Sequence, residues 1–237
     1  MISNLPFGLG SFWANSSYSF IKNEYKKRFV PFKTVISMVD LKLNLNKTAL
    51  VVIDMQKGIL TLDRKLEPNP ASQVVANVSK LVAKFREAGT PVFLVHVTSV
   101  DGRDMLHPLT DLQSPWGSAP RPADWSDFVD EIKPIGKDIV IAKRQWGAFY
   151  GTELDLQLRR RKIETIVLCG VSTNLGVETT ARDAYQIGYN QVFAVDAMAA
   201  NSKDEHEATL KYIFPRIGML RTTEEILRAP MENRLES

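Results

Sequence analysis

The sequence predicts an α/β protein of the Rossmann-like kind, a three-layer α/β/α fold in which helices cover both faces of a parallel sheet of about six strands. Short apolar runs alternate along the chain with stretches whose apolar residues recur at helical spacing. The apolar runs are continuous, which is typical of strands buried on both faces. An apolar content of 44% and a charged content of 24% are those of an ordinary globular domain.

The first strand, helix and strand are expected to form a right-handed βαβ unit. The run Ala49–Asp54 is apolar up to its closing carboxylate and predicts a buried strand. A helix is expected from Ala71 to Ala88, because apolar residues recur there at helical spacing and Gly89 stands where a C-terminal cap belongs. The run Pro91–Val97 predicts the second strand.

The third strand is expected at Asp138–Ala142 and is followed at once by Lys143. The stretch after it predicts a helix with Thr152 as its N-cap, because a Thr hydroxyl can accept a hydrogen bond from the first turn. Leu154 and Leu158 are expected to face the core from this helix.

The second half of the chain continues the alternation. An apolar run that ends with Cys169 and Gly170 predicts the fourth strand, and a polar turn, Val171–Asn174, leads from it into a helix that ends near Gly188. The remaining elements are a strand at Gln191–Val195 that ends at Asp196, a helix at His206–Phe214 in which His206 is expected to be exposed, and a short strand at Ile217–Leu220.

The segment Thr98–Pro134 has no periodic pattern and is rich in Pro and Gly. Loops of this length in compact domains often act as lids or as partner surfaces. The alternative is a structural excursion anchored by two buried tryptophans, Trp116 and Trp125. The sequence leaves both interpretations open.

The net charge of +3 arises in the first stretch of the chain, because residues 1–37 carry five Lys or Arg and one Glu, a balance of +4, which leaves −1 for the rest. A near-neutral body does not provide the basic surface that nucleic-acid binding needs. No apolar run approaches the roughly 20 residues that span a bilayer, so no membrane partner is expected. One cysteine excludes an intramolecular disulfide, and a cytoplasmic location is expected.

Residues 1–37 are expected to be an extension outside the fold, with the domain itself at 38–237. They are rich in Ser and Phe and lack a continuous hydrophobic segment of the secretory kind. Organelle targeting by this stretch, or a start of the working protein near Met38, stays open.

Three predicted strands end in reactive or polar positions, at Asp54, Lys143 and the turn after Gly170. The carboxyl ends of parallel strands meet at one edge of the sheet, so these positions can converge. A turn that opens a helix also presents backbone N–H groups and favours an anion. A carboxylate after a strand is equally common as a cap or loop residue, so this pattern alone leaves the role of Asp54 open.

The stretch CGVSTNLGVETTARDA, which starts at Cys169, resembles the isochorismatase-like hydrolases, often called cysteine hydrolases. Asp54 in VVIDMQ and Lys143 in AKRQWGAFYGTEL stand in register with two of that family's three catalytic positions, and Phe149 also fits. The resemblance covers roughly Ala49 to Ala199. The third position, where most members carry a nucleophilic cysteine, is Gly176 here.

The resemblance implies how such a site works. In the cysteine branch the Asp takes the thiol proton, the Lys supports the charge, and the thiolate attacks an amide carbonyl held by N–H groups of the turn. The peptide bond between Val171 and Ser172 is expected to be cis, as in that family. With Gly176 no side chain can attack, and the remainder resembles the isochorismatase branch, in which the Asp protonates a vinyl ether carbon and water completes the cleavage.

That role needs a carboxyl group that is partly protonated near neutral pH. Burial of Asp54 favours the protonated form, and a neighbouring Lys143 opposes it. Two departures also separate the chain from the isochorismatase branch, because Ser172 stands where those enzymes carry a Tyr and Gln145 where they carry an Arg. Gln is a poor replacement for an Arg that clamps a carboxylate with two hydrogen bonds.

The predicted site has Asp54 and Lys143 as catalytic residues and no cofactor or metal ion. His96, His107, Asp101 and Asp104 lack the tight spacing of the metal site in related nicotinamidases. The residues expected to contact a small-molecule substrate are Gln56, Gln145, Trp146, Phe149, Val171, Ser172, Thr173 and Gly176.

Three hypotheses follow for the function. The first is a hydrolase of a small, anionic metabolite with Asp54 as general acid/base. The second is a catalytically inactive family member that binds a small molecule or acts within a homo-oligomer, the assembly expected here. The third is a thiol amidase that uses Cys169, although the place of this residue in an apolar run favours a buried structural role.

Overall fold

The computed structural model describes residues 40–60, 65–112 and 121–232. The expected extension, residues 1–37, and Trp116 lie outside the described residues, so the domain boundary near residue 38 stays a prediction. No helix in the described part of the chain is both long enough and apolar enough to cross a membrane.

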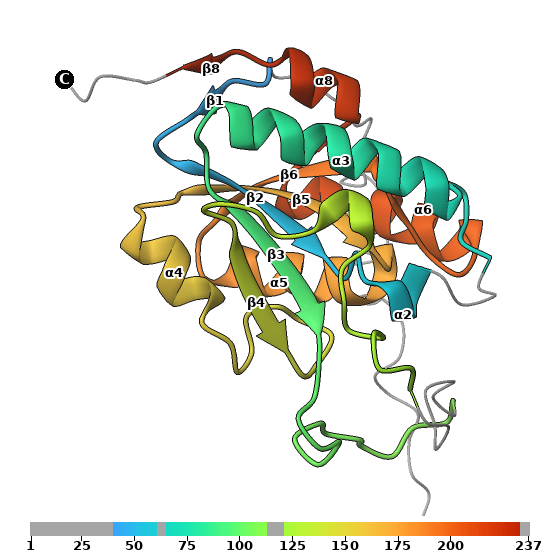
Figure 1. The fold of residues 1–237 in the computed structure, drawn as a ribbon. Coiled ribbons are helices and arrows are strands. Elements are labelled where there is room, and N and C mark those ends of the chain that lie inside the picture. Colours follow the sequence, from blue (N-terminus) through green and yellow to red (C-terminus); the bar gives the residue numbers. More distant parts are fainter. Residues whose placement is uncertain (1–39, 61–64, 113–120, 233–237) are drawn as a thin grey trace, which may run out of the picture. The chain divides into compact units, whose positions relative to one another are not determined.

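A sheet of six parallel strands forms the middle layer, as predicted (Figure 1). The chain builds one half of the sheet outward from its centre and then returns to build the other half, so the topology reverses between the two central strands. Ligands bind at such a reversal in open α/β sheets, just beyond the carboxyl ends of the strands. The spatial order is β4 (Ile139–Lys143), β3 (Val92–Val97), β2 (Thr48–Ile53), β5 (Thr165–Val171), β6 (Asn190–Ala199) and β7 (Met219–Arg221).

Helices cover both faces of the sheet and complete the three layers (Figure 1). One face packs against α3 (Ala71–Glu87) and α8 (Thr223–Arg228), and the other packs against α4 (Leu154–Arg160), α5 (Glu178–Gln186) and α7 (Phe214–Ile217). The other elements are a small parallel pair, β1 (Leu43–Asn44) and β8 (Met231–Glu232), and α2 (Lys57–Leu60), α6 (Lys203–Tyr212), η1 (Asp130–Ile132) and η2 (Thr173–Val177).

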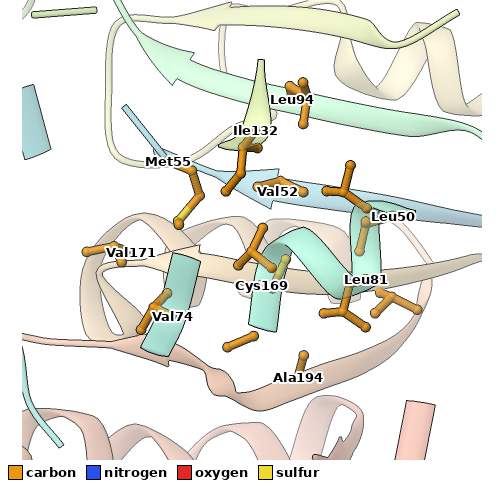
Figure 2. Close-up of a cluster of buried hydrophobic side chains, with 14 of the residues drawn as sticks. Leu50, Val52, Met55, Val74, Leu81, Leu94, Ile132, Cys169, Val171 and Ala194 are labelled. Carbon is orange, nitrogen blue, oxygen red and sulfur yellow. The ribbon is translucent and has the colours of Figure 1, made fainter. Parts of the chain in front are cut away.

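The central strands are buried on both faces, which explains their continuous apolar runs. Leu50 and Val52 of β2 point into the cluster under α3, which Figure 2 shows, whereas Val51 and Ile53 belong to the cluster on the opposite face. Cys169 of β5 lies in the α3 cluster with no exposed surface, and burial raises the pKa of its thiol. The expectation of a buried structural cysteine is therefore confirmed.

Strand β6 is longer than predicted. It continues through Asp196 to Ala199 instead of ending at Asp196. The pairing shows the reason, because Leu168 lies opposite Phe193 while Gly170 lies opposite Met198, so β6 contains extra residues at an irregularity and then resumes pairing. Asp196 lies inside this irregularity, so the strand end predicted at this polar residue was wrong.

Two helix starts differ from the prediction. Helix α4 begins at Leu154, and its N-cap is Glu153 instead of the predicted Thr152. Thr152, one position before the N-cap, still accepts a hydrogen bond from the N–H of Leu154 through Oγ1 at 3.1 Å. Helix α6 begins at Lys203, because Ser202 and Glu205 form a capping box. This earlier start brings His206 onto the packed side of the helix, so the expectation that it is exposed was wrong.

Candidate active site

A pocket of about 170 Å³ opens at the carboxyl edge of the sheet, beside β2 and β5, the central strands between which the topology reverses. Asp54 follows β2, and Val97, Lys143 and Val171 are the last residues of β3, β4 and β5. The predicted convergence of strand ends is therefore what forms the inner surface of the pocket.

Asp54 and Lys143 form an ion pair at the base of this pocket. The Nζ of Lys143 lies 2.8 Å from Oδ2 of Asp54, and the two side chains are 1% and 7% exposed. Lys143 Nζ also donates to the carbonyl oxygen of Trp146 at 2.6 Å. The backbone of Asp54 has a left-handed φ of 54°, and its N–H donates to the carbonyl oxygen of Val95 at 2.9 Å. Backbone contacts thus fix both partners.

Burial raises the pKa of Asp54, and the attraction and hydrogen bond of Lys143 oppose that shift without cancelling it. The second carboxyl oxygen, Oδ1, is buried and accepts no hydrogen bond from the described residues. A carboxyl group with one oxygen held by Lys143 and the other without a partner can carry a proton on the unheld oxygen. Asp54 therefore has the arrangement of a general acid or base.

The turn after β5 forms the wall opposite Lys143. The peptide bond between Val171 and Ser172 is cis, as the resemblance implied. The carbonyl oxygen of Ser172 accepts hydrogen bonds from the N–H groups of Leu175 and Val177, both at 3.2 Å, which wraps the chain into the single wide turn η2 before α5 begins.

Gly176 faces the ion pair directly. A Cβ atom at this position would lie 3.0 Å from Asp54 Oδ2 and 3.3 Å from Lys143 Nζ. The φ of Gly176 is outside the left-handed region, so the backbone does not require glycine there. A residue with a side chain at position 176 would place it against the two charged groups. Because this residue is a glycine, no side chain from position 176 lies against the pair.

A buried histidine supports the turn from behind. His206 of α6 is 4% exposed, and its Nδ1 lies 2.8 Å from Oγ1 of Thr173, which is also buried. Burial lowers the pKa of His206, against a smaller opposing effect of Glu207. The capping box at Ser202 was the sequence signal that could have placed His206 inward.

Seven of the ten predicted site residues line the pocket and three do not. The amide of Gln56 is bound by the backbone N–H of Val97 and the carbonyl oxygens of Val97 and Trp125, Phe149 stacks on Tyr189, and Thr173 binds His206. These three side chains bind or stack on other protein groups behind the pocket lining, so the structure gives no support for a contact between them and a substrate. Those that line the pocket are Asp54, Lys143, Gln145, Trp146, Val171, Ser172 and Gly176.

The long segment between β3 and β4 supplies pocket residues that sequence reasoning did not find. Trp125 is 6% exposed and confirms one of the two expected anchors, and Arg121 stacks its guanidinium over the indole at 4.3 Å from the ring centroid. No periodic pattern marks such residues, and a Trp or Arg in a loop was the only signal. The lining residues outside the prediction are Ile59, Val97, Met105, Leu106, His107, Arg121, Trp125, Arg144 and Leu175.

The described residues contain no group of three or more His, Cys, Asp or Glu side chains arranged to hold a metal ion. His96 was one of the residues considered as a metal ligand. Its Nδ1 lies 2.7 Å from the carbonyl oxygen of Ser126, and its ring stacks on Phe128.

Comparison with known proteins agrees with this geometry. The family model described as the isochorismatase domain matches residues 48–225. The isochorismatase family protein YwoC of Bacillus subtilis is 54% identical over 190 residues, covering 80% of this chain and 97% of the relative. YecD of Escherichia coli O157:H7, from the same family, is 50% identical and covers 80% and 99%.

The structure of an isochorismatase family protein from Burkholderia thailandensis is similar with a TM-score of 0.74 and 40% identity, covering 80% of this chain and 97% of that one. The matched region contains Asp54, Lys143 and the turn at Gly176. The chain therefore belongs to the isochorismatase family of hydrolases.

Proposed function

We propose that this protein hydrolyses a small anionic metabolite by general acid/base catalysis at Asp54, without a nucleophilic side chain. The observation that carries the proposal is Gly176, because it lines the pocket beside the ion pair, where a nucleophile's side chain would begin 3.0 Å from Asp54 Oδ2, and glycine provides no side chain that could attack. The inferred chemistry needs a proton donor and a water molecule, and no covalent intermediate.

Asp54 would act through Oδ1, the buried oxygen that accepts no hydrogen bond from the described residues. In a vinyl ether cleavage, its proton goes to the substrate carbon, water adds to the resulting oxocarbenium carbon, and the C–O bond breaks to give a carbonyl and an alcohol. The water's protons replace the one that Asp54 gave and protonate the leaving oxygen. Lys143 holds Oδ2 and balances the charge, and N–H groups near Ser172 and Gly176 would hold a developing oxyanion or a carboxylate.

The thiol hypothesis loses its main requirement, which is that Cys169 reaches the pocket. Its side chain packs in the cluster under α3, and it is not among the residues that line the pocket. Burial also raises the pKa of the thiol, so little thiolate forms near neutral pH. A binding protein without catalysis stays the second candidate, because the same pocket would serve it.

The test is a screen of small carboxylates that carry a vinyl ether, ester or amide bond, followed by kinetics on whichever compound is cleaved. Asp54→Asn should lower kcat by about 10²–10⁴-fold, the usual contribution of general acid/base catalysis. Because the acid form is needed, kcat/KM should fall as the pH rises through the raised pKa of Asp54.

Iodoacetamide treatment of the parent protein is the control for thiol chemistry and should leave its rate unchanged. An Asp54→Asn variant with full activity would contradict the proposal, and so would a parent enzyme that alkylation inactivates. Binding of panel compounds without any cleavage would favour the non-catalytic candidate.

A further inference from the structure

The Lys and Arg side chains that line the pocket differ in whether an Asp side chain contacts them. Lys143 is paired with Asp54, and Arg144 is paired with Asp104. Hydrogen bonds from Ser99 and Arg144 lower the pKa of Asp104 to about 2, so the partner of Arg144 stays ionised. Among the described residues, no carboxylate forms an ion pair with Arg121, the third Lys or Arg side chain of the lining.

Arg121 is held in place by an aromatic surface. Its guanidinium carbon lies 4.3 Å from the centroid of the Trp125 ring, and its Nη1 is 3.5 Å from Sδ of Met105. Stacking uses the flat face of a guanidinium and leaves the N–H groups at its edge for a ligand. Trp125 itself lies directly on Gly58 of α2, where a Cβ atom would fall 2.1 Å from the indole. Gly58, Trp125 and Arg121 thus form a stack that starts on a helix and ends at the pocket.

We propose that Arg121 is the residue that selects the ligand of this pocket, by binding a carboxylate through the edge of its guanidinium. The inference rests on the proposed function in that it takes the pocket at Asp54 as the substrate site. The planar edge of a guanidinium matches the two oxygens of a carboxylate. Arg144 is paired with Asp104, and Lys143 is held at the base of the pocket by Asp54 and the carbonyl oxygen of Trp146, which leaves Arg121 as the cation placed to bind such a group.

The size and lining of the pocket indicate the size and shape of the rest of the ligand. A dry cavity of roughly 150 Å³ can hold benzene, and this pocket has about 170 Å³ with Trp125, Trp146 and Leu106 on its walls. A planar apolar body about as large as one ring, carrying one carboxylate, fits both the volume and the charge. Benzoate is the simplest probe with these features, and benzamide has the same shape without the charge.

Ligand-observed NMR titrations of benzoate and benzamide against the full chain test the proposal. The parent protein should bind benzoate in preference to benzamide, and Arg121→Gln should weaken benzoate binding about five- to tenfold while leaving benzamide unchanged. A loss of this size is what removing one charge-assisted hydrogen-bonded contact produces when solvent screens it at an exposed arginine. The benzoate affinity of Arg121→Lys should lie between those of the parent and Arg121→Gln, because lysine keeps the charge and loses the planar edge.

Arg103→Gln is the matched control, since it removes the same charge from the same exposed segment at a residue that does not line the pocket. It should leave the benzoate preference intact. Equal benzoate affinities of the parent and Arg121→Gln would overturn the proposal, as would an equal loss in Arg103→Gln or the absence of saturable benzoate binding at millimolar concentrations.

The same titration separates this proposal from the catalytic one. Asp54→Asn removes the one carboxylate among the lining residues and leaves Lys143 without an acidic partner, so it should bind benzoate at least as well as the parent does. If Asp54→Asn keeps its hydrolytic activity while Arg121→Gln loses the benzoate preference, the catalytic role fails and the binding role of Arg121 stands. The opposite pair of results overturns the role of Arg121 alone.

Discussion

The inner surface and the outer rim of the pocket are built in opposite ways. The inner surface, which we call the floor, consists of Asp54, Lys143 and the turn residues Val171, Ser172, Leu175 and Gly176, which lie at or just after the ends of strands. The rim, which we call the roof, consists of Met105, Leu106, His107 and Arg121 from the segment between β3 and β4. Lys143 is 1% exposed and Leu106 is 61% exposed, and His107 and Arg121 of the roof are exposed as well.

The contrast indicates how the work of the site is divided. Groups that move protons must be held to within fractions of an ångström, and the sheet provides that rigidity. Groups that recognise a substrate can lie on a segment with little packing, where substitutions cost the fold little. Changes to the floor should therefore affect folding and chemistry, while matched changes at or near the roof should cost the fold less and act mainly on ligand affinity.

The largest difference should come from two glycines with left-handed backbone, Gly170 beside the floor and Gly102 near the roof. A Cβ at Gly170, where φ is 115°, would lie 2.0 Å from the carbonyl oxygen of Ile53, whereas at Gly102, where φ is 78°, nothing lies within 4 Å. Gly170→Ala should lower the free energy of unfolding by at least about 4 kcal/mol, enough to unfold much of the protein. Gly102→Ala should cost only about 1–2 kcal/mol, for the backbone strain. Urea unfolding measures both, and similar values for the two variants would contradict the comparison.

The next difference concerns the two ion pairs. Lys143→Met leaves Asp54 buried without its cation and should lower the free energy of unfolding by about 3–5 kcal/mol near neutral pH. Because the pKa of Asp54 is raised in the folded state, ionisation of this group opposes folding as the pH rises through that pKa. The loss in Lys143→Met should therefore shrink when the pH is lowered.

Arg144→Met breaks the exposed pair with Asp104 and is the control for that experiment. Its melting temperature should stay nearly unchanged, because solvent screens pairs at the surface. A loss of unfolding free energy in Lys143→Met that does not depend on pH would contradict this explanation. It would show that the loss does not come from a buried Asp54 charge without its cation.

A smaller effect is expected at the support behind the floor. Thr173→Val removes the partner of His206 Nδ1 and should cost about 1–3 kcal/mol, the usual penalty for a buried polar group left unpaired. Since burial lowers the pKa of His206, this residue contributes stability above the unfolded value of about 6.5, and that stability is lost as the pH falls below it.

Thermal melts at about pH 7.5 and about pH 5.5 measure this dependence. His206→Asn should reduce the acid-induced fall in melting temperature by about 2–4 °C, the shift that roughly 1 kcal/mol produces in a domain of this size. The matched change in the roof, His107→Asn, should leave the fall as it is in the parent. An equal response of the two variants would mean that His206 is not protected from protonation.

The smallest effect should come from Trp146, whose side chain lines the pocket but is 62% exposed. Lys143 binds the backbone oxygen of Trp146, so truncating the ring does not disturb the ion pair. Trp146→Ala should raise KM a few-fold through lost apolar contact, with kcat within about twofold and stability within about 0.5 kcal/mol of the parent. Steady-state kinetics and a urea melt check this, and a large fall in kcat would place Trp146 with the floor.

The sequence was informative for the floor and uninformative for the roof, for a physical reason. Strands buried on both faces produce continuous apolar runs, so the positions after Ile53, Ala142 and Gly170 could be located and brought to one edge of the sheet. The resemblance to a family then identified which polar residues at those ends carry the chemistry.

The roof has no such regularity. Arg121 reaches the pocket because Trp125 lies on Gly58, a contact between residues far apart in the chain that leaves no periodic pattern. Similarly, the inward position of His206 depends on where α6 starts, which the capping box at Ser202 determines and apolar periodicity does not reveal. Gln56 and Phe149 matched the family's pattern and yet support the walls from outside.

The most direct test of the floor is the reactivity of Gly176→Cys toward iodoacetamide. The new Cβ would fall 3.0 Å from Asp54 Oδ2, 3.1 Å from Ile53 Cγ2 and 3.3 Å from Lys143 Nζ, close contacts with the ends of three side chains that would have to shift by a few tenths of an ångström. A thiol beside a cation and at the start of a helix has a lowered pKa. It should therefore react far faster than the buried Cys169 of the parent, and Asp54→Asn in the same variant should slow the reaction near neutral pH.

Mass spectrometry of the alkylated peptide gives the rate at each position, and circular dichroism establishes that the variant is folded. We expect rapid modification at position 176, negligible modification at Cys169, and a slower rate when Asp54 is replaced. A folded Gly176→Cys protein that reacts no faster than Cys169 does in the parent would show that position 176 does not face the ion pair, and the roles given to Asp54 and Lys143 would then be wrong.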